Sequence, residues 1–284
     1  MFESIGRSLA LVKTSWEILM SEKQLLVFPV LSGIVTILVM ITFVLPLLLA
    51  GAFMNIVPAG PVVYYGFLFL FYVASYFVVI FFNTALITCV NDKLNGRPVS
   101  VATGLSNSAR HLPSIIGWAV LAATVGLILN LLEERAGFVG DIVLAIIGGV
   151  WSLVTFFVVP VLVFEEKGVF SAIRESFALF KKTWGETVVG SVSIGLVFML
   201  IGIAGALCVF ATLMLGSWMV FIAALALFIL LVVILAVIAS AMQGIFVVAL
   251  YTYAKTGQVP GAFRKDLIEQ AFVRKSPSMR AGNI

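Results

Sequence analysis

The 284-residue chain is 62% hydrophobic and only 11% charged, with a formal net charge of +4. Soluble globular domains are about 45–50% apolar, so this composition excludes that class and predicts an integral membrane protein. The basic residues are sparse and flank apolar runs, which predicts a role in membrane orientation and excludes nucleic acid as a partner.

The chain opens with an apolar stripe at helical spacing, and the same stripe recurs later. The two copies are Phe2, Ile5, Leu9, Val12 and Trp16, then Phe170, Ile173, Phe177, Phe180 and Trp184. Alternating steps of three and four residues place each set on one face of a helix. Because a long apolar run follows each copy, we predict a surface helix along the membrane that leads into a transmembrane hairpin.

The first apolar run, Leu25–Asn91, contains no charged residue. One span needs about 20 residues, so the run is long enough for two long helices or three short ones. The turn residues Pro58–Pro61 favour two spans.

The middle of the chain repeats this plan less clearly. The polar segment Asp92–His111 carries a weaker apolar stripe, which predicts a second surface helix. The third span is expected from Pro113 to Leu132, and the fourth from Phe138 to Phe164 with a kink at Pro160.

The last third begins with the polar residues Glu165–Gly168 and the second copy of the stripe. Charge is again absent from Thr187 to Ala254, and a turn at Gly216–Trp218 divides this run into a fifth and a sixth span. The tail carries a short apolar stripe at Phe263, Leu267 and Ala271, which predicts one more surface helix.

The basic residues predict the orientation of these spans. With six spans, all but one of the 17 basic residues lie on one side of the membrane, the exception being Arg135. The positive-inside rule makes that side cytoplasmic, so both termini are expected inside the cell and the protein in the plasma or inner membrane.

We therefore predict an all-α fold and a single integral membrane domain over residues 1–284. Its six transmembrane helices form three parallel repeats of a cytoplasmic amphipathic helix plus a hairpin. The repeats are residues 1–91, 92–164 and 165–254, followed by a cytoplasmic tail, residues 255–284.

Several segments resemble an uncharacterised family of six-span bacterial and archaeal membrane proteins. They are Ser4–Ser8, Lys13–Trp16, Leu25–Gly33 and the tail residues Gly257, Val259, Pro260 and Phe263. More loosely, the repeated plan is similar to the membrane domain of some glycerophosphodiester phosphodiesterases. This resemblance implies membrane residence and contact with lipid-derived material, but no enzyme activity, because the chain has no soluble catalytic domain.

Polar neutral residues mark the candidate ligand site. They lie in the cytoplasmic half of the second and sixth spans: Asn83, Thr84, Thr88, Ser240 and Gln243. Hydrogen bonds between packed helices are the favoured interpretation of these residues, and contact with a solute or lipid headgroup is the alternative. Asp141, the acidic residue nearest to a span interior, is expected to be an interfacial cap.

The sequence offers little for catalysis. His111 is the single histidine, and no metal-ligand spacing or nucleophile motif accompanies it, so we expect no cofactor, no metal and no enzyme activity. The favoured function is a non-enzymatic scaffold or accessory protein in contact with membrane lipids, as a homo-oligomer or with a membrane-protein partner. The alternatives are a passive transporter or channel for an apolar or lipid-like solute, and a lipid-processing enzyme.

Overall fold

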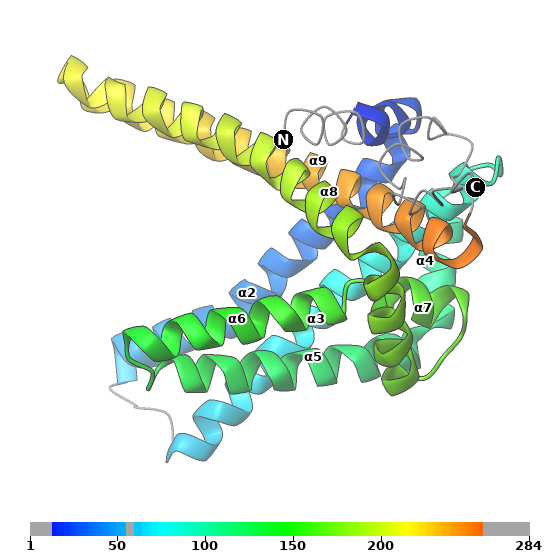
Figure 1. The fold of residues 1–284 in the computed structure, drawn as a ribbon. Helices are drawn as coiled ribbons and strands as arrows, with labels where there is room; N and C mark the ends of the chain where they lie inside the picture. The colour runs from blue at the N-terminus through cyan, green and yellow to red at the C-terminus, as the bar shows by residue number, and fades with distance from the viewer. Residues whose placement is uncertain (1–12, 55–59, 258–284) are drawn as a thin grey trace, which may run out of the picture.

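The computed structural model describes residues 13–54 and 60–257, which are helical throughout apart from turns and short connections (Figure 1). A helix over residues 13–21 leads into the short 3₁₀ helix η1 (Lys23–Leu26). The remaining helices are α2 (Val27–Met54), α3 (Gly60–Leu94), α4 (Val101–Arg110), α5 (Leu112–Glu133), α6 (Phe138–Val154), α7 (Val158–Phe164), α8 (Val169–Thr212), η2 (Leu213–Leu215) and α9 (Trp218–Thr256). The predicted all-α class is confirmed.

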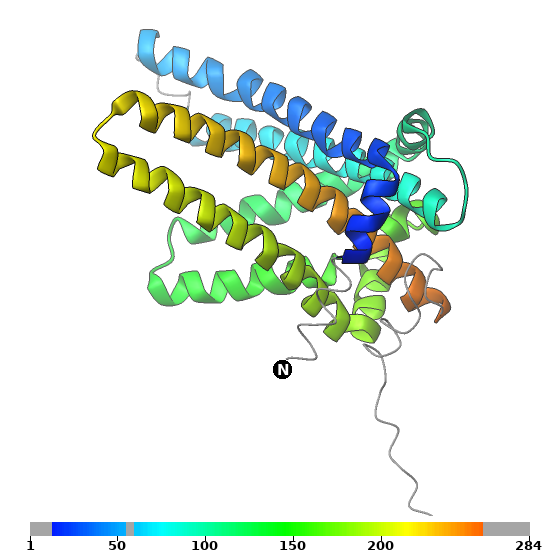
Figure 2. The same ribbon diagram turned by 90° about the horizontal axis from the view of Figure 1, so that it is seen from above.

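Six segments of the described chain are long and apolar enough to cross a membrane, as expected from the sequence. They are Lys23–Pro46, Val63–Leu94, Leu112–Glu133, Val139–Phe164, Ile194–Thr212 and Trp218–Thr256. They pair as hairpins, α2 with α3, α5 with α6 and α8 with α9 (Figure 2). This arrangement supports a polytopic membrane protein.

Two ends of the bundle differ in structure. We call the end that carries α4, α7 and the start of α8 the basal end, and the opposite end, which carries residues 134–137 and η2, the distal end (Figure 1). At the distal end the predicted turn is confirmed, because Gly216 has φ +65°, a left-handed conformation that glycine adopts without a steric cost. Gly257 ends α9 at the basal end in the same way, with φ +68°.

The fourth span is broken where the sequence predicts a kink. Helix α6 ends at Val154 and α7 begins at Val158, two residues before Pro160. A proline has no N–H for the carbonyl four residues earlier, here that of Phe156, and its ring crowds that carbonyl. The chain therefore leaves the helical hydrogen-bond pattern at residues 155–157.

The fifth span is continuous with the surface helix that precedes it. Helix α8 contains one residue with non-helical backbone angles, Thr183 (φ −124°, ψ 21°), which separates the surface part from the membrane-spanning part. A helix is therefore present over residues 169–182, where the sequence predicts a surface helix, and it is separated from the span at this residue.

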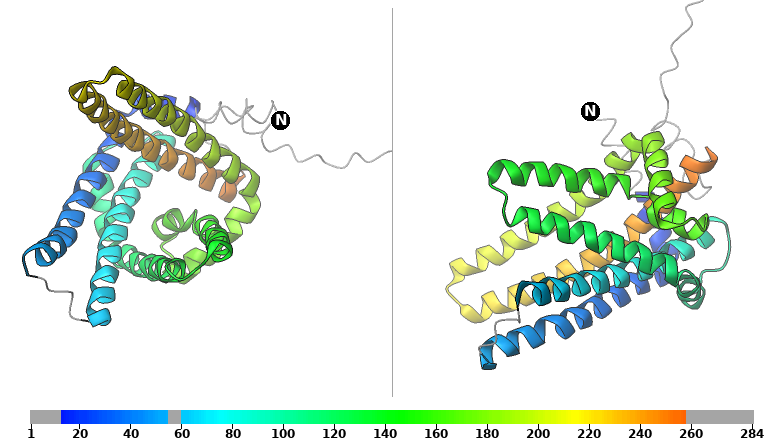
Figure 3. Two further views of the ribbon diagram at one scale, coloured as in Figure 1. Left: turned by 90° about the vertical axis from the view of Figure 1, so that its left-hand side faces the viewer. Right: turned by 90° about the horizontal axis from the view of Figure 1, so that it is seen from below.

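The buried core lies at the basal end. Helix α3 is central, because it contacts α2, α4, α5, α7 and α9. Five fully buried side chains, from α2, α3, α5, α9 and the break before α7, meet there: Phe28, Leu86, Ile115, Ile245 and Phe157. Towards the distal end the three hairpins diverge (Figure 3) and expose large apolar side chains such as Ile37, Ile146 and Leu227. These exposed side chains fit a hydrocarbon environment better than water.

The surface helices pack through small residues together with part of the predicted apolar stripe. Partly buried stripe residues that contact the core are Ile173 and Phe180 of α8 and Val101 and Leu105 of α4. In the surface part of α8 the buried residues are Ala172, Ser176, Leu179 and Thr183, whereas Phe170 and Phe177 of the stripe are 78% and 39% exposed. Helix α4 buries Gly104 and Ser108. Phe170 and Phe177 are thus the stripe residues that the structure shows as exposed, and we expect them to face the membrane interface.

The first copy of the stripe is described only at its end. Trp16 is 42% exposed, while Phe2, Ile5, Leu9 and Val12 lie outside the described residues, as does the short helix expected in the tail. The threefold repeat itself remains a prediction.

Candidate functional site

A crevice of about 250 Å³ opens between α2, α3 and α9 in the basal half of the bundle. It brings together three of the five residues proposed from the sequence, Asn83, Ser240 and Gln243. Helix α2 adds Ser32 to this polar group, and Phe28, Phe82 and Val247 are among the apolar residues that line the rest. The crevice therefore combines apolar walls with a few neutral polar groups, the usual composition of a site for a small apolar ligand.

The polar groups of the crevice differ in how they are bonded. Gln243 donates a hydrogen bond through Nε2 to Ser191 Oγ of α8, at 3.2 Å, and so joins α9 to α8. Among the residues that the structure describes, Asn83 is half-buried and its amide has no hydrogen-bond partner. Gln243 thus fits the packing interpretation, whereas Asn83 has donors and acceptors free for a ligand.

Close helix packing forms the floor of this crevice. Gly244 lies against Leu86, and a Cβ atom at this glycine would come within 2.5 Å of Leu86 Cδ2. A side chain at this position would force Leu86 to move, so glycine at residue 244 favours the close approach of α9 to α3.

Thr84 and Thr88 lie away from the crevice. Thr84 is fully buried, and its hydroxyl has no partner within the described part of the chain. Thr88 donates to the Thr84 carbonyl and accepts a hydrogen bond from Asn107 of α4, at 2.8 Å. Successive helical residues are about 100° apart, so Thr84 and Thr88 point to other sides of α3 than Asn83. The one cluster expected from the sequence is therefore divided.

A second polar cluster, the basal ion cluster, was missed by the sequence reasoning. It joins the loop after α7 to α8 and α9 through Glu165, Lys167, Glu175, Tyr251 and Lys255. Lys255 Nζ lies 2.9 Å from Glu165 and 2.8 Å from Glu175, and Lys167 Nζ lies 2.7 and 3.3 Å from the same carboxylates. Tyr251 donates a 2.8 Å hydrogen bond to Glu165.

The basal ion cluster changes the acidity of its carboxylates. Burial alone would raise the pKa of Glu165, but hydrogen bonds from Lys167, Lys255 and Tyr251 outweigh it, and the pKa is lowered. The hydrogen bond from Lys255 is the main cause of the lowered pKa of Glu175. Both glutamates are therefore held ionised, and three segments of the chain are joined by charge.

The remaining acidic and metal-binding candidates are simple to place. Asp141 is exposed in the first turn of α6, near the positive end of the helix dipole, but Gly137 occupies the N-cap position that the sequence suggested for Asp141. Over residues 13–54 and 60–257, no three His, Cys, Asp or Glu side chains lie close enough together to hold a metal ion.

Comparison of the chain with protein families gives a match. Residues 62–261, which cover five of the six candidate spans and the α3 and α9 walls of the crevice, match a family described as a family of unknown function (DUF6159). No curated protein matches the chain, so the likeness to the membrane domain of glycerophosphodiester phosphodiesterases remains a prediction. Since the match spans well over half of the sequence, the chain belongs to this family of unknown function, DUF6159.

Proposed function

We propose that the protein is a non-enzymatic membrane accessory protein that binds a lipid or another uncharged amphiphile in the crevice between α2, α3 and α9. The observation that carries this proposal is the half-buried, unpartnered amide of Asn83 in an apolar crevice within the spans. In hydrocarbon an amide without a hydrogen bond is costly, so a ligand that bonds to it gains free energy.

The lining of the crevice indicates the chemistry of this ligand. No charged residue of the described part of the chain lines it, so the group that meets Asn83, Ser240 and Gln243 is neutral and carries carbonyl or hydroxyl oxygens, as the glycerol-ester part of a lipid does. The apolar residues Val79 and Leu86 continue the lining and suit the start of an acyl chain.

We also propose that the basal end faces the cytoplasm of a plasma or inner membrane. This rests on the basic residues, because Lys93, Arg97, Arg174 and Lys181 belong to basal segments and Arg135 to a distal one. A cysteine introduced at Arg135 should react with an impermeant thiol reagent in intact cells lacking Cys208, and one at Lys181 should not. The opposite pattern of labelling would reverse the orientation.

Replacement of Asn83 by leucine tests the ligand. The variant removes the free amide and keeps a side chain of similar volume, so it should retain less co-purifying lipid, measured by mass spectrometry of the gently purified protein. The matched control is Asn130→Leu, the same change at a half-buried position of another span, α5, outside the crevice. It should leave the bound lipid unchanged.

Three outcomes are informative. Less bound lipid in N83L, with a melting temperature close to that of the unchanged protein, supports the site. Equal lipid in N83L and N130L, together with a lower melting temperature for N83L, means that Asn83 only packs helices. Movement of lipid between the leaflets of proteoliposomes that requires Asn83 would instead favour the passive transporter.

A further inference from the structure

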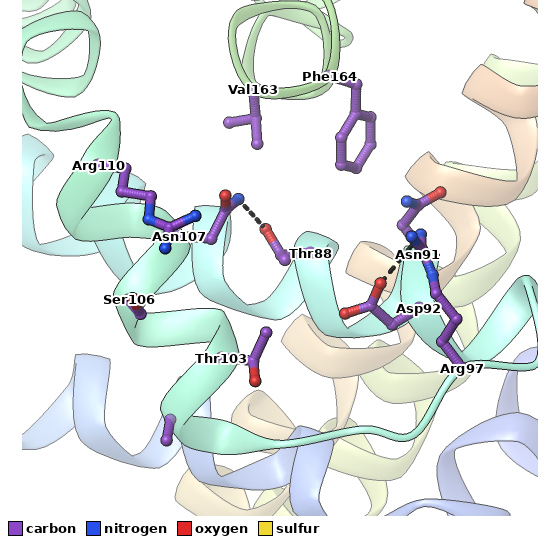
Figure 4. Close-up of a pocket in the computed structure, with 11 residues that line it drawn as sticks. Thr88, Asn91, Asp92, Arg97, Thr103, Ser106, Asn107, Arg110, Val163 and Phe164 are labelled. Carbon is purple, nitrogen blue, oxygen red and sulfur yellow. Dashed lines mark hydrogen bonds and ion pairs between the residues drawn. The ribbon is translucent and has the colours of Figure 1, made fainter.

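A second, larger hollow lies at the basal end, on another side of α3 from the crevice (Figure 4). This polar cleft has a volume of about 580 Å³ and lies between the end of α3, the loop after it, α4 and the end of α7. Its position follows from the docking of α4, because Ser108 of α4 donates a hydrogen bond to the Phe81 carbonyl of α3 at 3.0 Å. The cleft is therefore built by the packing of buried residues and is not formed by surface side chains alone.

The charges in the cleft are two arginines and one aspartate. Arg97 forms an ion pair with Asp92 at 3.0 Å, so these two charges largely neutralise one another. Arg110 lines the cleft from the other side (Figure 4), is exposed, and has no ion-pair partner in the part of the chain that the structure describes. The cleft thus keeps a net charge of about one positive unit, and that charge is located at Arg110.

Neutral hydrogen-bond donors surround this charge. Asn107 lies one turn before Arg110 and is held in place by its 2.8 Å bond to Thr88 Oγ1. The hydroxyls of Thr103 and Ser106 also line the cleft, and neither has a partner among the described residues. A guanidinium with adjacent hydroxyls and an amide is the donor set that recognises phosphate oxygens.

One wall of the cleft is apolar. Val163 and Phe164 at the end of α7 face the arginines and threonines across it (Figure 4). A ligand with a single negative charge and an apolar portion would match both walls, as a phosphodiester does. Its two sources are the headgroup of a phospholipid and a soluble phosphate compound.

We propose that this cleft is a binding site for a phosphate-bearing anion, with Arg110 as its principal charged contact and Asn107, Thr103 and Ser106 as neutral donors. The site does not depend on the ligand of the crevice. Asn83 belongs to the crevice, Thr88 belongs to the cleft, and no residue lines both.

Native mass spectrometry of the full chain in an uncharged detergent tests this site. The probe is phosphatidylglycerol, and diacylglycerol serves as the same lipid without its phosphate. The variants are Arg110→Gln, Arg110→Lys and the matched control Arg174→Gln, which removes an exposed positive charge from the basal part of α8 outside the cleft. Thermal unfolding of each variant verifies that the fold is retained.

We expect R110Q to weaken phosphatidylglycerol binding about tenfold or more, as loss of a charge-assisted hydrogen bond would do, and R174Q to leave it unchanged. R110K should lie between them, because lysine keeps the charge and loses the planar pair of donors. Binding of diacylglycerol should be the same in all variants. Equal weakening by R110Q and R174Q, or binding to R110Q that matches the unchanged protein, would overturn the proposal.

Addition of inorganic phosphate distinguishes the two sources. If phosphate displaces phosphatidylglycerol from the unchanged protein but not the residual lipid from R110Q, the cleft accepts a soluble phosphate compound. If phosphate has no effect while the difference between R110Q and R174Q persists, the phosphate group of a lipid is the ligand.

Discussion

The break in the fourth span should depend on one hydroxyl group from another helix. Ser176, in the surface part of α8, is fully buried. Its Oγ accepts a hydrogen bond from the Phe157 N–H at 2.9 Å and donates one to the Val154 carbonyl at 2.6 Å. These two backbone groups flank the break before α7, where the regular helical pattern is interrupted. Ser176 thus completes the hydrogen bonds that the break leaves open.

Replacement of Ser176 by alanine removes both bonds and leaves an N–H and a carbonyl without partners. An unsatisfied buried polar group costs about 1–3 kcal/mol, so the loss of partners for both groups should lower the free energy of unfolding by roughly 2–6 kcal/mol. The matched control is Ser152→Ala, because Ser152 is exposed and bonds only to the Gly148 carbonyl of its own helix. Its effect should be within about 0.5 kcal/mol.

Reaction of Cys89 with a thiol probe during heating provides the assay. Cys89 is buried in the basal core and Cys208 is exposed, so a background with Cys208→Ser reports only the opening of the core. Cys89 should become reactive towards the thiol probe at a clearly lower temperature in the S176A protein than in the S152A protein. If the two variants melt together, packing around Pro160 holds the break, and the argument from Ser176 is wrong.

Two further predictions concern the basal end. Gly104→Ala should lower the melting temperature, because a Cβ there would lie 2.9 Å from the Ala85 carbonyl oxygen, a backbone atom that cannot move aside, whereas Gly66→Ala meets no atom within 4 Å and should be tolerated. Because the pKa of Glu165 is lower in the folded protein than in the unfolded chain, its ionised form stabilises the fold. This contribution to the free energy of unfolding is fully present above about pH 4.3, the ordinary pKa of a glutamate, and is lost as the pH falls through the lower pKa of the folded state. Melting curves between neutral and acidic pH should therefore show E165Q to be less stable than the unchanged protein near neutrality and closer to it in acid. The matched control is E134Q, which removes an exposed carboxylate without an ion pair in the described part of the chain, and it should leave the melting temperature at neutral pH unchanged.

The transmembrane plan could be predicted from the sequence because it depends on local composition. A charge-free run of sufficient length has to be helical in a membrane, and polar residues with glycine mark where it ends. Gly216 is an example, since its φ of +65° is the conformation that a glycine turn suggests. The break near Pro160 follows from the covalent structure of proline in the same way.

The two hollows could not be predicted in this way because they depend on how helices pack. Helical spacing alone could have separated Asn83 from Thr88, since five residues correspond to about 140° around the helix. The position of Arg110 beside α7 required the docking of α4, which buries Gly104 and Ser108 as well as part of its apolar stripe. Ser8 and Ser176 occupy the same position in the two copies of the apolar stripe, and this recurrence could have marked Ser176 as a structural residue. The sequence could not show its hydrogen-bond partners, because they lie at the break in the fourth span.

The length of α9 bears on the kind of membrane that the protein fits. Its 39 residues extend about 58 Å at about 1.5 Å per residue, nearly twice the roughly 30 Å of a bilayer's hydrocarbon layer. Strong tilt or local thickening of the bilayer accommodates such a mismatch. A thinner bilayer would leave more of α9 outside the hydrocarbon, and a thicker one would draw its last turns, with Tyr251 and Lys255, towards it. Bilayer thickness thus sets how deeply the ion pairs of Lys255 lie in the headgroup layer.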